Sequence, residues 1–331
     1  MADVAADRAP VIKPAGAWRS YALPVILLLL FALLPFGGHF ISEAYLLSLV
    51  TRVMIFSIAA LSLDLLVGYG ALVSFGHAAF MGIGAYAVGI LASHGFGDAL
   101  VALPVTLAAS ALFAWLTGIV CLRTRGVYFI MITLAFGQMA FFTASSLAPY
   151  GGDDGLTLQT RSTIAGFDIL ASDRALYYVT LLCLVAVYLF CRSLVTSRFG
   201  RVFRGTRENA TRMTTLGYNV YRYQLVAYVV AGMIAGLSGF LLANATSFVA
   251  PAYMSWQRSG ELLIMIILGG IGSLNGAIIG TGVFLLLEEW LAGFTEHWKM
   301  IFGPFLVLVV VFVPGGLLGI SRWIMRRLRG G

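Results

Sequence analysis

The sequence predicts an all-α polytopic membrane protein with about ten transmembrane helices, some of them short or broken. Hydrophobic residues make up 60% of its 331 residues, and charged residues make up only 11%. Soluble domains carry about 25% charged residues, so this composition excludes a soluble protein. The net charge is +7, but the basic residues lie between or beside apolar runs, which argues against a nucleic-acid partner.

The first apolar run, 21–38, follows Arg8, Lys13 and Arg19, as the apolar part of a signal peptide would. No small-residue cleavage site comes after it, and further apolar runs follow. We therefore expect a retained first helix, preceded by a cytoplasmic tail over residues 1–20.

The remaining apolar runs predict the other spans of a membrane domain that covers residues 21–320. Two of these runs are short for the ~20 residues that a span needs, so we expect them to be tilted, broken or re-entrant. These two are 256–271 and 276–291. The others are 44–67, 77–95, 99–122, 127–147, 175–195, 223–247 and 299–320.

Charge sets the direction of these spans, because cytoplasmic loops carry an excess of arginine and lysine. Arg123 and Arg125 place their loop inside, and the arginine-rich tail over 321–331 places the C-terminus inside. The loop 148–174 carries more acidic than basic residues and is expected in the periplasm. Both termini are thus predicted to be cytoplasmic.

An arginine-rich loop over 196–222 interrupts the apolar runs. Its six arginines oppose one acid, Glu208, so we expect it on the cytoplasmic side. Its interior, TRENATRMTTLG, predicts a short polar helix with its own start. The loop is either a docking surface or only an anchor to anionic lipid headgroups. A pure anchor needs no such helix, so docking is favoured.

Two glycine-rich segments resemble each other, GALVSFGHAAFMGIGAY over Gly70–Tyr86 and GGIGSLNGAIIGTGVF over Gly269–Phe284. Broken helices at matching positions of two halves are typical of a transport pathway. The alternative is that the glycines only let helices approach closely.

Polar residues within apolar runs are candidates for function, because burying them in a membrane is costly. Asp64 and His77 flank the first glycine-rich segment. Asp64 alternatively lies at the cytoplasmic end of its helix near water, and His77 alternatively is a hydrogen-bonded group at a helix start. Other candidates for lining a path for a zwitterion are Ser74, Gly76, Thr133, Gln138 and Asn275.

Several kinds of catalytic site are missing from the sequence. The only lysines, Lys13 and Lys299, lie outside any phosphate-binding loop, so any ATP must be hydrolysed by another chain. No hydrolase motif is present, and the three cysteines lack metal-ligand spacing. We therefore expect no enzyme activity, no cofactor and no metal.

Five collinear stretches between residues 49 and 320 carry a family resemblance. They are GYGALVSFGHAAFMGIGAYAVGIL, RTRGVYFIMITLAFGQM, SRFGRVFRGTRENATRMTTLGYNVYRYQLVAYVVAGMIAGLSGFLLA, ILGGIGSLNGAIIGTG and FVPGGLLGI. The chain resembles the larger of the two permease types in branched-chain amino-acid ABC importers.

The resemblance implies a subunit of a bacterial inner-membrane importer for leucine, isoleucine and valine. Its partners would be a second, related permease in a heterodimer, two ATP-binding subunits, a periplasmic solute-binding protein and membrane lipid. The loop 196–222 would be the coupling segment that inserts into an ATP-binding subunit. Its candidate residues are Arg204, Arg207, Glu208, Asn209 and Gly217. Asn209 replaces the first alanine of the family's Glu-Ala-Ala…Gly motif, and the glycine comes three residues late.

Three alternatives stay open. Importers of urea, amides and other amino acids look alike within the family. A proton-coupled secondary carrier would use Asp64 and His77, and a structural protein would transport nothing. For an importer, we expect the solute-binding protein to dock on 151–172 and 248–258.

Overall fold

The computed structural model describes residues 43–294 together with Phe31, His297, Met300, 302–304, 315–317 and Gly319. Most of the predicted first span, most of the last span and both terminal tails lie outside these residues. Within the described part, six helices are long and apolar enough to cross a membrane. These are α2 (Glu43–Gly70), α4 (Ala99–Cys121), α5 (Val127–Ser146), α6 (Asp173–Thr196), α9 (Val220–Thr246) and α11 (Leu274–Ala292).

Two further apolar helices are shorter. α3 (His77–Ser93) has 17 residues and α10 (Trp256–Gly269) has 14. A helix of 14 residues extends only about 21 Å, so α10 is short of a full span, as its sequence predicts. The expectation that the next run is equally short is wrong, because α11 has 19 residues.

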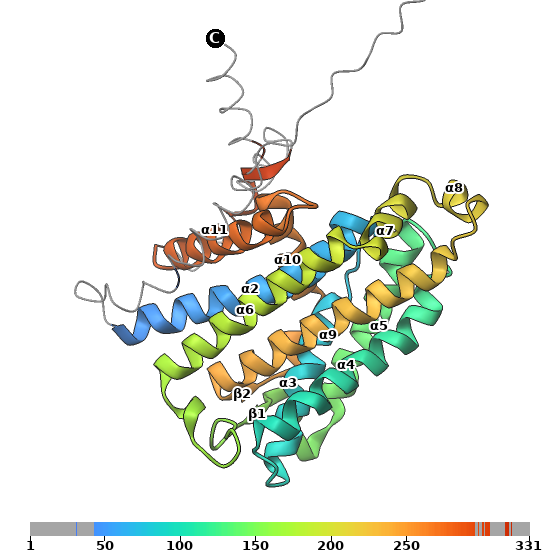
Figure 1. Cartoon of the computed structure of the whole chain (residues 1–331). Helices are drawn as coiled ribbons and strands as arrows, with labels where there is room; N and C mark the ends of the chain where they lie inside the picture. The colour runs from blue at the N-terminus through green and yellow to red at the C-terminus, as the bar shows by residue number, and fades with distance from the viewer. Residues whose placement is uncertain are drawn as a thin grey trace, which may run out of the picture.

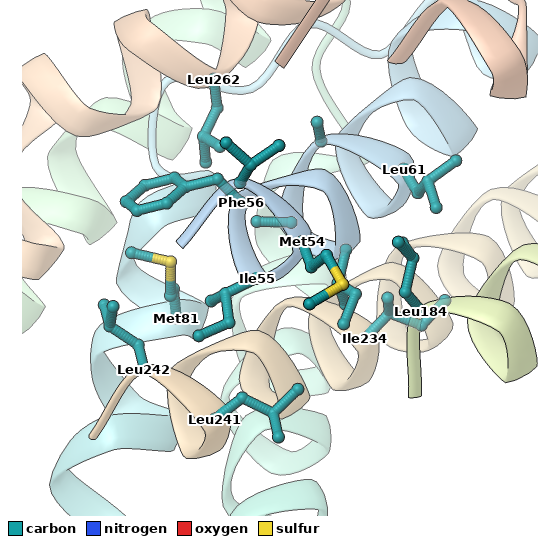
Figure 2. Close-up of a cluster of buried hydrophobic side chains, with 14 of the residues drawn as sticks. Met54, Ile55, Phe56, Leu61, Met81, Leu184, Ile234, Leu241, Leu242 and Leu262 are labelled. Carbon is teal, nitrogen blue, oxygen red and sulfur yellow. The ribbon is translucent and has the colours of Figure 1, made fainter. Parts of the chain in front are cut away.

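The helix α2 lies at the centre of the described fold. It packs against α9, α6, α11 and α10, and 78% of its apolar window is buried, compared with 22% for α4 and for α5. Figure 2 shows Met54, Ile55 and Phe56 of α2 among apolar side chains from the surrounding helices. A helix that is apolar on all sides belongs inside a bundle, whereas α4 and α5 leave broad faces free.

Small residues let α3 approach α9 closely. A methyl group at Gly84 would collide with the carbonyl group of Gly236, and one at Gly239 would collide with that of Met81. The interpretation that glycines let helices approach closely is therefore confirmed for Gly84 of the first glycine-rich segment and for Gly239 of α9.

The helices run between two distinct ends (Figure 1). At one end, α6 continues into α7 (Arg198–Glu208) and α8 (Ala210–Thr215), from which α9 returns. At the other end, β1 (Leu156–Thr157) pairs antiparallel with β2 (Phe248–Val249). The described part of the chain is therefore helical apart from this two-stranded sheet, which the all-α prediction did not include.

The β1–β2 end also holds four 3-10 turns, η2 (Ala148–Tyr150), η3 (Gly152–Asp154), η4 (Ile169–Ala171) and η5 (Pro251–Met254). The segments 151–172 and 248–258, expected to form one external surface, thus lie together at this end. At the α7–α8 end, Arg125 and Gly217 line one hollow of about 460 Å³. The loop that contains Arg125 and the loop 196–222, which their charges assign to the same side of the membrane, therefore meet.

Candidate functional site

The arginine-rich loop folds into two helices separated by one residue. Ser197 caps α7 by accepting a hydrogen bond from the Gly200 N–H at 3.3 Å. Asn209 is extended, ends α7, and caps α8 by accepting from the Arg212 N–H at 2.9 Å. This differs from the single helix expected over 206–217, because asparagine favours a cap over a helix interior. Gly217, with φ +87°, ends the segment.

The helix α7 turns one face to the protein and the other outward. Gly200, Phe203 and Thr206 are buried, and the Phe203 ring lies against Gly70 at the end of α2. Arg198, Arg201 and Glu208 are exposed. The segment is therefore anchored on the ends of the spans and presents a charged outer surface.

Arg204 and Arg207 connect α7 to the C-terminal ends of two spans. Arg204 Nη2 donates to the Val195 carbonyl of α6 at 2.6 Å, and its guanidinium group lies 5.3 Å from the Tyr69 ring centroid. Arg207 Nη1 donates to the Gly68 carbonyl of α2. The last carbonyl groups of a helix lack partners within the helix, so both arginines act as caps. Each side chain remains partly accessible to a partner.

Beside Arg207, the end of α2 meets the turn between α10 and α11. Asp64 is completely buried, and its Oδ1 accepts a hydrogen bond from the Gly272 N–H at 2.7 Å. A methyl group at Gly68 would lie 2.5 Å from the Gly272 Cα. We call Asp64, Gly68, Arg207 and Gly272 the glycine joint. Asp64 lies near the C-terminal end of α2, as its alternative interpretation expects, but the proximity to water expected there is wrong, since the α10–α11 turn covers it.

The C-terminal glycine motif reaches the same place. A methyl group at Gly316 would lie 2.5 Å from the Gly270 nitrogen in the α10–α11 turn. Three glycine-rich stretches that are far apart in the sequence, around residues 68, 270 and 316, therefore converge next to α7.

A second polar region holds the segment between α2 and α3 in place through hydrogen bonds. His77 Nε2 lies 2.7 Å from Ser62 Oγ, and the Ala78 N–H donates to Ser259 Oγ at 3.0 Å. The Phe75 N–H donates to Thr133 Oγ1 at 3.3 Å. His77 is the first residue of α3, so its interpretation as a hydrogen-bonded group at a helix start is confirmed.

Four candidates for the path gather in this region, namely Ser74, Gly76, His77 and Thr133. Gly76 packs on the Thr133 carbonyl, and Ser74 and His77 are completely buried. Among the described residues, Ser74 Oγ and His77 Nδ1 have no hydrogen-bond partner.

The other candidates lie elsewhere. Asn275 Oδ1 on α11 accepts a hydrogen bond from the Tyr188 hydroxyl of α6 at 2.7 Å. Gln138 is half-buried in a shallow hollow on the outer face of α5, beside Phe142 and Ser146. Asp64 belongs to the glycine joint. The structure therefore does not bring all predicted path residues to one site.

A charged cluster among α2, α10 and α11 contains Arg52, an ionisable residue inside an apolar run, together with partners that the sequence did not identify. Arg52 Nη2 lies 3.6 Å from Glu288 Oε1, and Arg258 Nη1 lies 2.6 Å from Glu261 Oε2. Both guanidinium groups lie over the Phe56 ring, at 5.9 and 5.8 Å from its centroid. The available signal was the presence of charged residues within apolar runs.

Within the part of the chain that the structure describes, no group of three or more His, Cys, Asp or Glu side chains is placed to hold a metal ion. The family model described as "Branched-chain amino acid transport system / permease component" matches residues 45–312. The chain belongs to this family.

Relatives of two kinds support the assignment. The "High-affinity branched-chain amino acid transport system permease protein LivM" of Salmonella typhimurium is 28% identical over 298 residues, which are 83% of this chain and 70% of the relative. LivM of Escherichia coli K12 gives the same values. The permease protein LivH of Escherichia coli K12 is 30% identical over 154 residues, 46% of this chain and 48% of the relative. No solved structure matches the chain.

Proposed function

We propose that the chain is the larger permease subunit of an ATP-binding-cassette importer that carries leucine, isoleucine and valine from the periplasm to the cytoplasm across a bacterial inner membrane. The observation that carries this proposal is the family match over residues 45–312. The similarity to LivM over 83% of the chain supports the larger permease type. Both termini are cytoplasmic in this proposal.

The segment α7–α8 is the docking element for an ATP-binding subunit. Its exposed charged residues offer a surface for an acidic groove rim, and electrostatic complementarity of this kind mainly raises the association rate and specificity. Both ends of the segment are joined covalently to the long helices α6 and α9. A nucleotide-driven movement of the partner is therefore transmitted to the spans. Glu208, Asn209 and Gly217 set the shape of this element.

The remaining partners follow from the two ends and two free faces of the molecule. The solute-binding protein docks at the β1–β2 end, opposite α7–α8. A second, related permease and membrane lipid cover the outer faces of α4 and α5, which are mostly unburied. ATP is hydrolysed by two separate subunits, because the sequence offers no phosphate-binding loop of its own.

The path for the solute involves the polar break between α2 and α3 and the outer face of α5. A polar side chain such as Gln138, facing outward from the middle of a span, is costly in lipid and favourable beside a hydrated path. Ser74, Gly76, His77 and Thr133 supply buried polar or small groups behind it.

A proton-coupled secondary carrier is the second candidate. Such a carrier needs a relay between Asp64 and His77. Their hydrogen bonds go to different partners, since Asp64 bonds Gly272 and His77 bonds Ser62. Because these two hydrogen bonds share no partner, the importer is favoured.

Uptake of labelled leucine by cells with and without the chain tests the proposal, with valine, glutamate and urea as competitors. We expect uptake that requires the chain, is reduced by ATP depletion, and is competed by valine but not by urea. Uptake abolished by an uncoupler with ATP intact would favour the carrier. Competition by urea alone would retain the permease but change its substrate.

A further inference from the structure

We propose that Asp64 is a positioning residue that, together with Arg207, transmits the position of α7 to the α10–α11 turn. Loss of either charge then uncouples ATP hydrolysis from solute transport. This inference rests on the proposed function and assigns Asp64 to coupling rather than to the solute path.

The observed hydrogen bond of Asp64 does not require a carboxylate group. The bond from the Gly272 N–H to Asp64 Oδ1 needs only an acceptor oxygen, which the amide of asparagine also supplies. The second carboxylate oxygen, Oδ2, is buried and has no hydrogen-bond partner among the described residues. Burying an unpaired charged group is costly. The observed packing therefore leaves the second carboxylate oxygen without a partner, and the proposed second arrangement supplies one.

Arg207 lies beside Gly68 and Gly272, the two residues that contact Asp64 in the joint. It donates from Nη1 to the carbonyl of Gly68, which lies one turn after Asp64 on α2. The same Nη1 lies 3.8 Å from the place where a methyl group on Gly272 would be, and Gly272 is the residue whose N–H donates to Asp64. A guanidinium group has five N–H donors, so it can hold the Gly68 carbonyl, Asp64 Oδ2, or both. A small movement of α7 decides between these arrangements.

Tight backbone packing lets the glycine joint transmit a movement of α7. The backbones of Gly68 and Gly272 are so close that a methyl group at Gly68 would lie 2.6 Å from the Gly272 nitrogen. Phe203 of α7 presses on Gly70 at the end of the same helix. Tightly packed contacts switch between discrete arrangements and do not deform continuously. A displacement of α7 is therefore passed to α2 and, through Asp64, to the turn that begins α11.

The test uses the complete complex of this chain with its second permease, two ATP-binding subunits and the solute-loaded binding protein, in proteoliposomes. The variants are Asp64→Asn, which keeps an acceptor oxygen, and Arg207→Gln. The control is Arg123→Gln, which changes an exposed residue outside the joint. Three quantities are measured for each, namely leucine transported per ATP hydrolysed, stimulation of ATP hydrolysis by the loaded binding protein, and the apparent unfolding temperature.

We expect both variants to assemble and to hydrolyse ATP, with leucine transported per ATP reduced about fivefold or more, the lower range of typical coupling between sites. The double variant should transport as much leucine per ATP as the more impaired single variant, because the two residues act as one unit. Normal leucine-to-ATP ratios in both single variants, even with a lowered unfolding temperature, would overturn the inference. If the Asp64→Asn complex fails to assemble, the leucine-to-ATP ratio of the Arg207→Gln complex decides whether the inference holds. A wild-type complex without ATP-driven transport would instead overturn the proposed function.

Discussion

Gly68 is the residue on which the geometry of the α2 end depends most. It faces the Gly272 backbone, and a methyl group at position 68 would also lie only 2.5 Å from Asp64 Oδ1. Gly272 itself has φ +79°, a conformation that residues with a Cβ rarely adopt. The two glycines therefore permit the contact between spans that brings Asp64 to the α10–α11 turn.

We predict that Gly68→Ala separates α2 from this turn. Adding a methyl group to a packed contact typically costs about 1–3 kcal/mol. The apparent unfolding temperature of the purified chain in detergent should fall, and transport should fall with it. Gly97→Ala is the matched control, because nothing lies within 4 Å of its added methyl group. Equal unfolding temperatures for the two variants would contradict the packing described here.

At the scale of elements, α7 and α8 form the part of the chain whose shape is set by local capping. Asn209 separates the two helices and Gly217 ends the second with φ +87°. Proline fixes φ near −65°, so it cannot occupy position 217 without changing the turn into α9. The surroundings of Gly217 are otherwise open.

We predict that Glu208→Ala combined with Gly217→Pro abolishes transport while the protein still inserts in the membrane. The change alters the docking element without touching the packed core. Leucine uptake and the amount of chain in the membrane fraction are the two measurements. The matched control is Gly95→Pro, at another open glycine with φ +81° at the opposite end of the molecule. Normal uptake by the double variant would remove the coupling role from this segment.

The boundaries of the helices were largely predictable from the sequence. Which helices and turns contact one another was not. Apolar runs ending at glycine or charged residues place α3, α4, α5 and α9 within a few residues of their expected ranges. The break at Asn209, which ends α7 and starts α8 within the single helix expected over 206–217, was not predicted, although asparagine is a common helix cap. The Asp64–Gly272 bond joins residues 208 positions apart, and the Arg207–Gly68 bond joins residues 139 apart. Hydrophobic periodicity indicates which face of a helix is buried, but not which helix covers it.

The candidate site was predictable only in part for the same reason. The cost of a polar group in a membrane singled out Asp64 and His77, but it did not separate a solute path from a mechanical joint. Gly68 and Gly272 carry no chemical signal in a chain with 38 glycines. Their importance depends on a contact between distant segments.

At the scale of the whole molecule, the proposed importer requires α7–α8 and β1–β2 on opposite sides of the membrane. We predict that Thr160→Cys, in the exposed loop after β1, reacts with a membrane-impermeant maleimide in intact cells. Thr215→Cys, at the exposed end of α8, should react only after the cells are opened. Both changes are made in a chain whose native Cys121, Cys183 and Cys191 are replaced by alanine. Labelling of both positions in intact cells would contradict this topology.

The most direct test of the central claim is transport in a reconstituted system. The chain is placed in proteoliposomes with a second permease of the LivH type, two ATP-binding subunits and a leucine-loaded binding protein, with the binding protein and ATP on opposite sides of the bilayer. We predict leucine transport to the ATP side only when ATP, the binding protein and this chain are all present. Leucine transport by the chain alone under a proton gradient, without ATP, would contradict the importer mechanism.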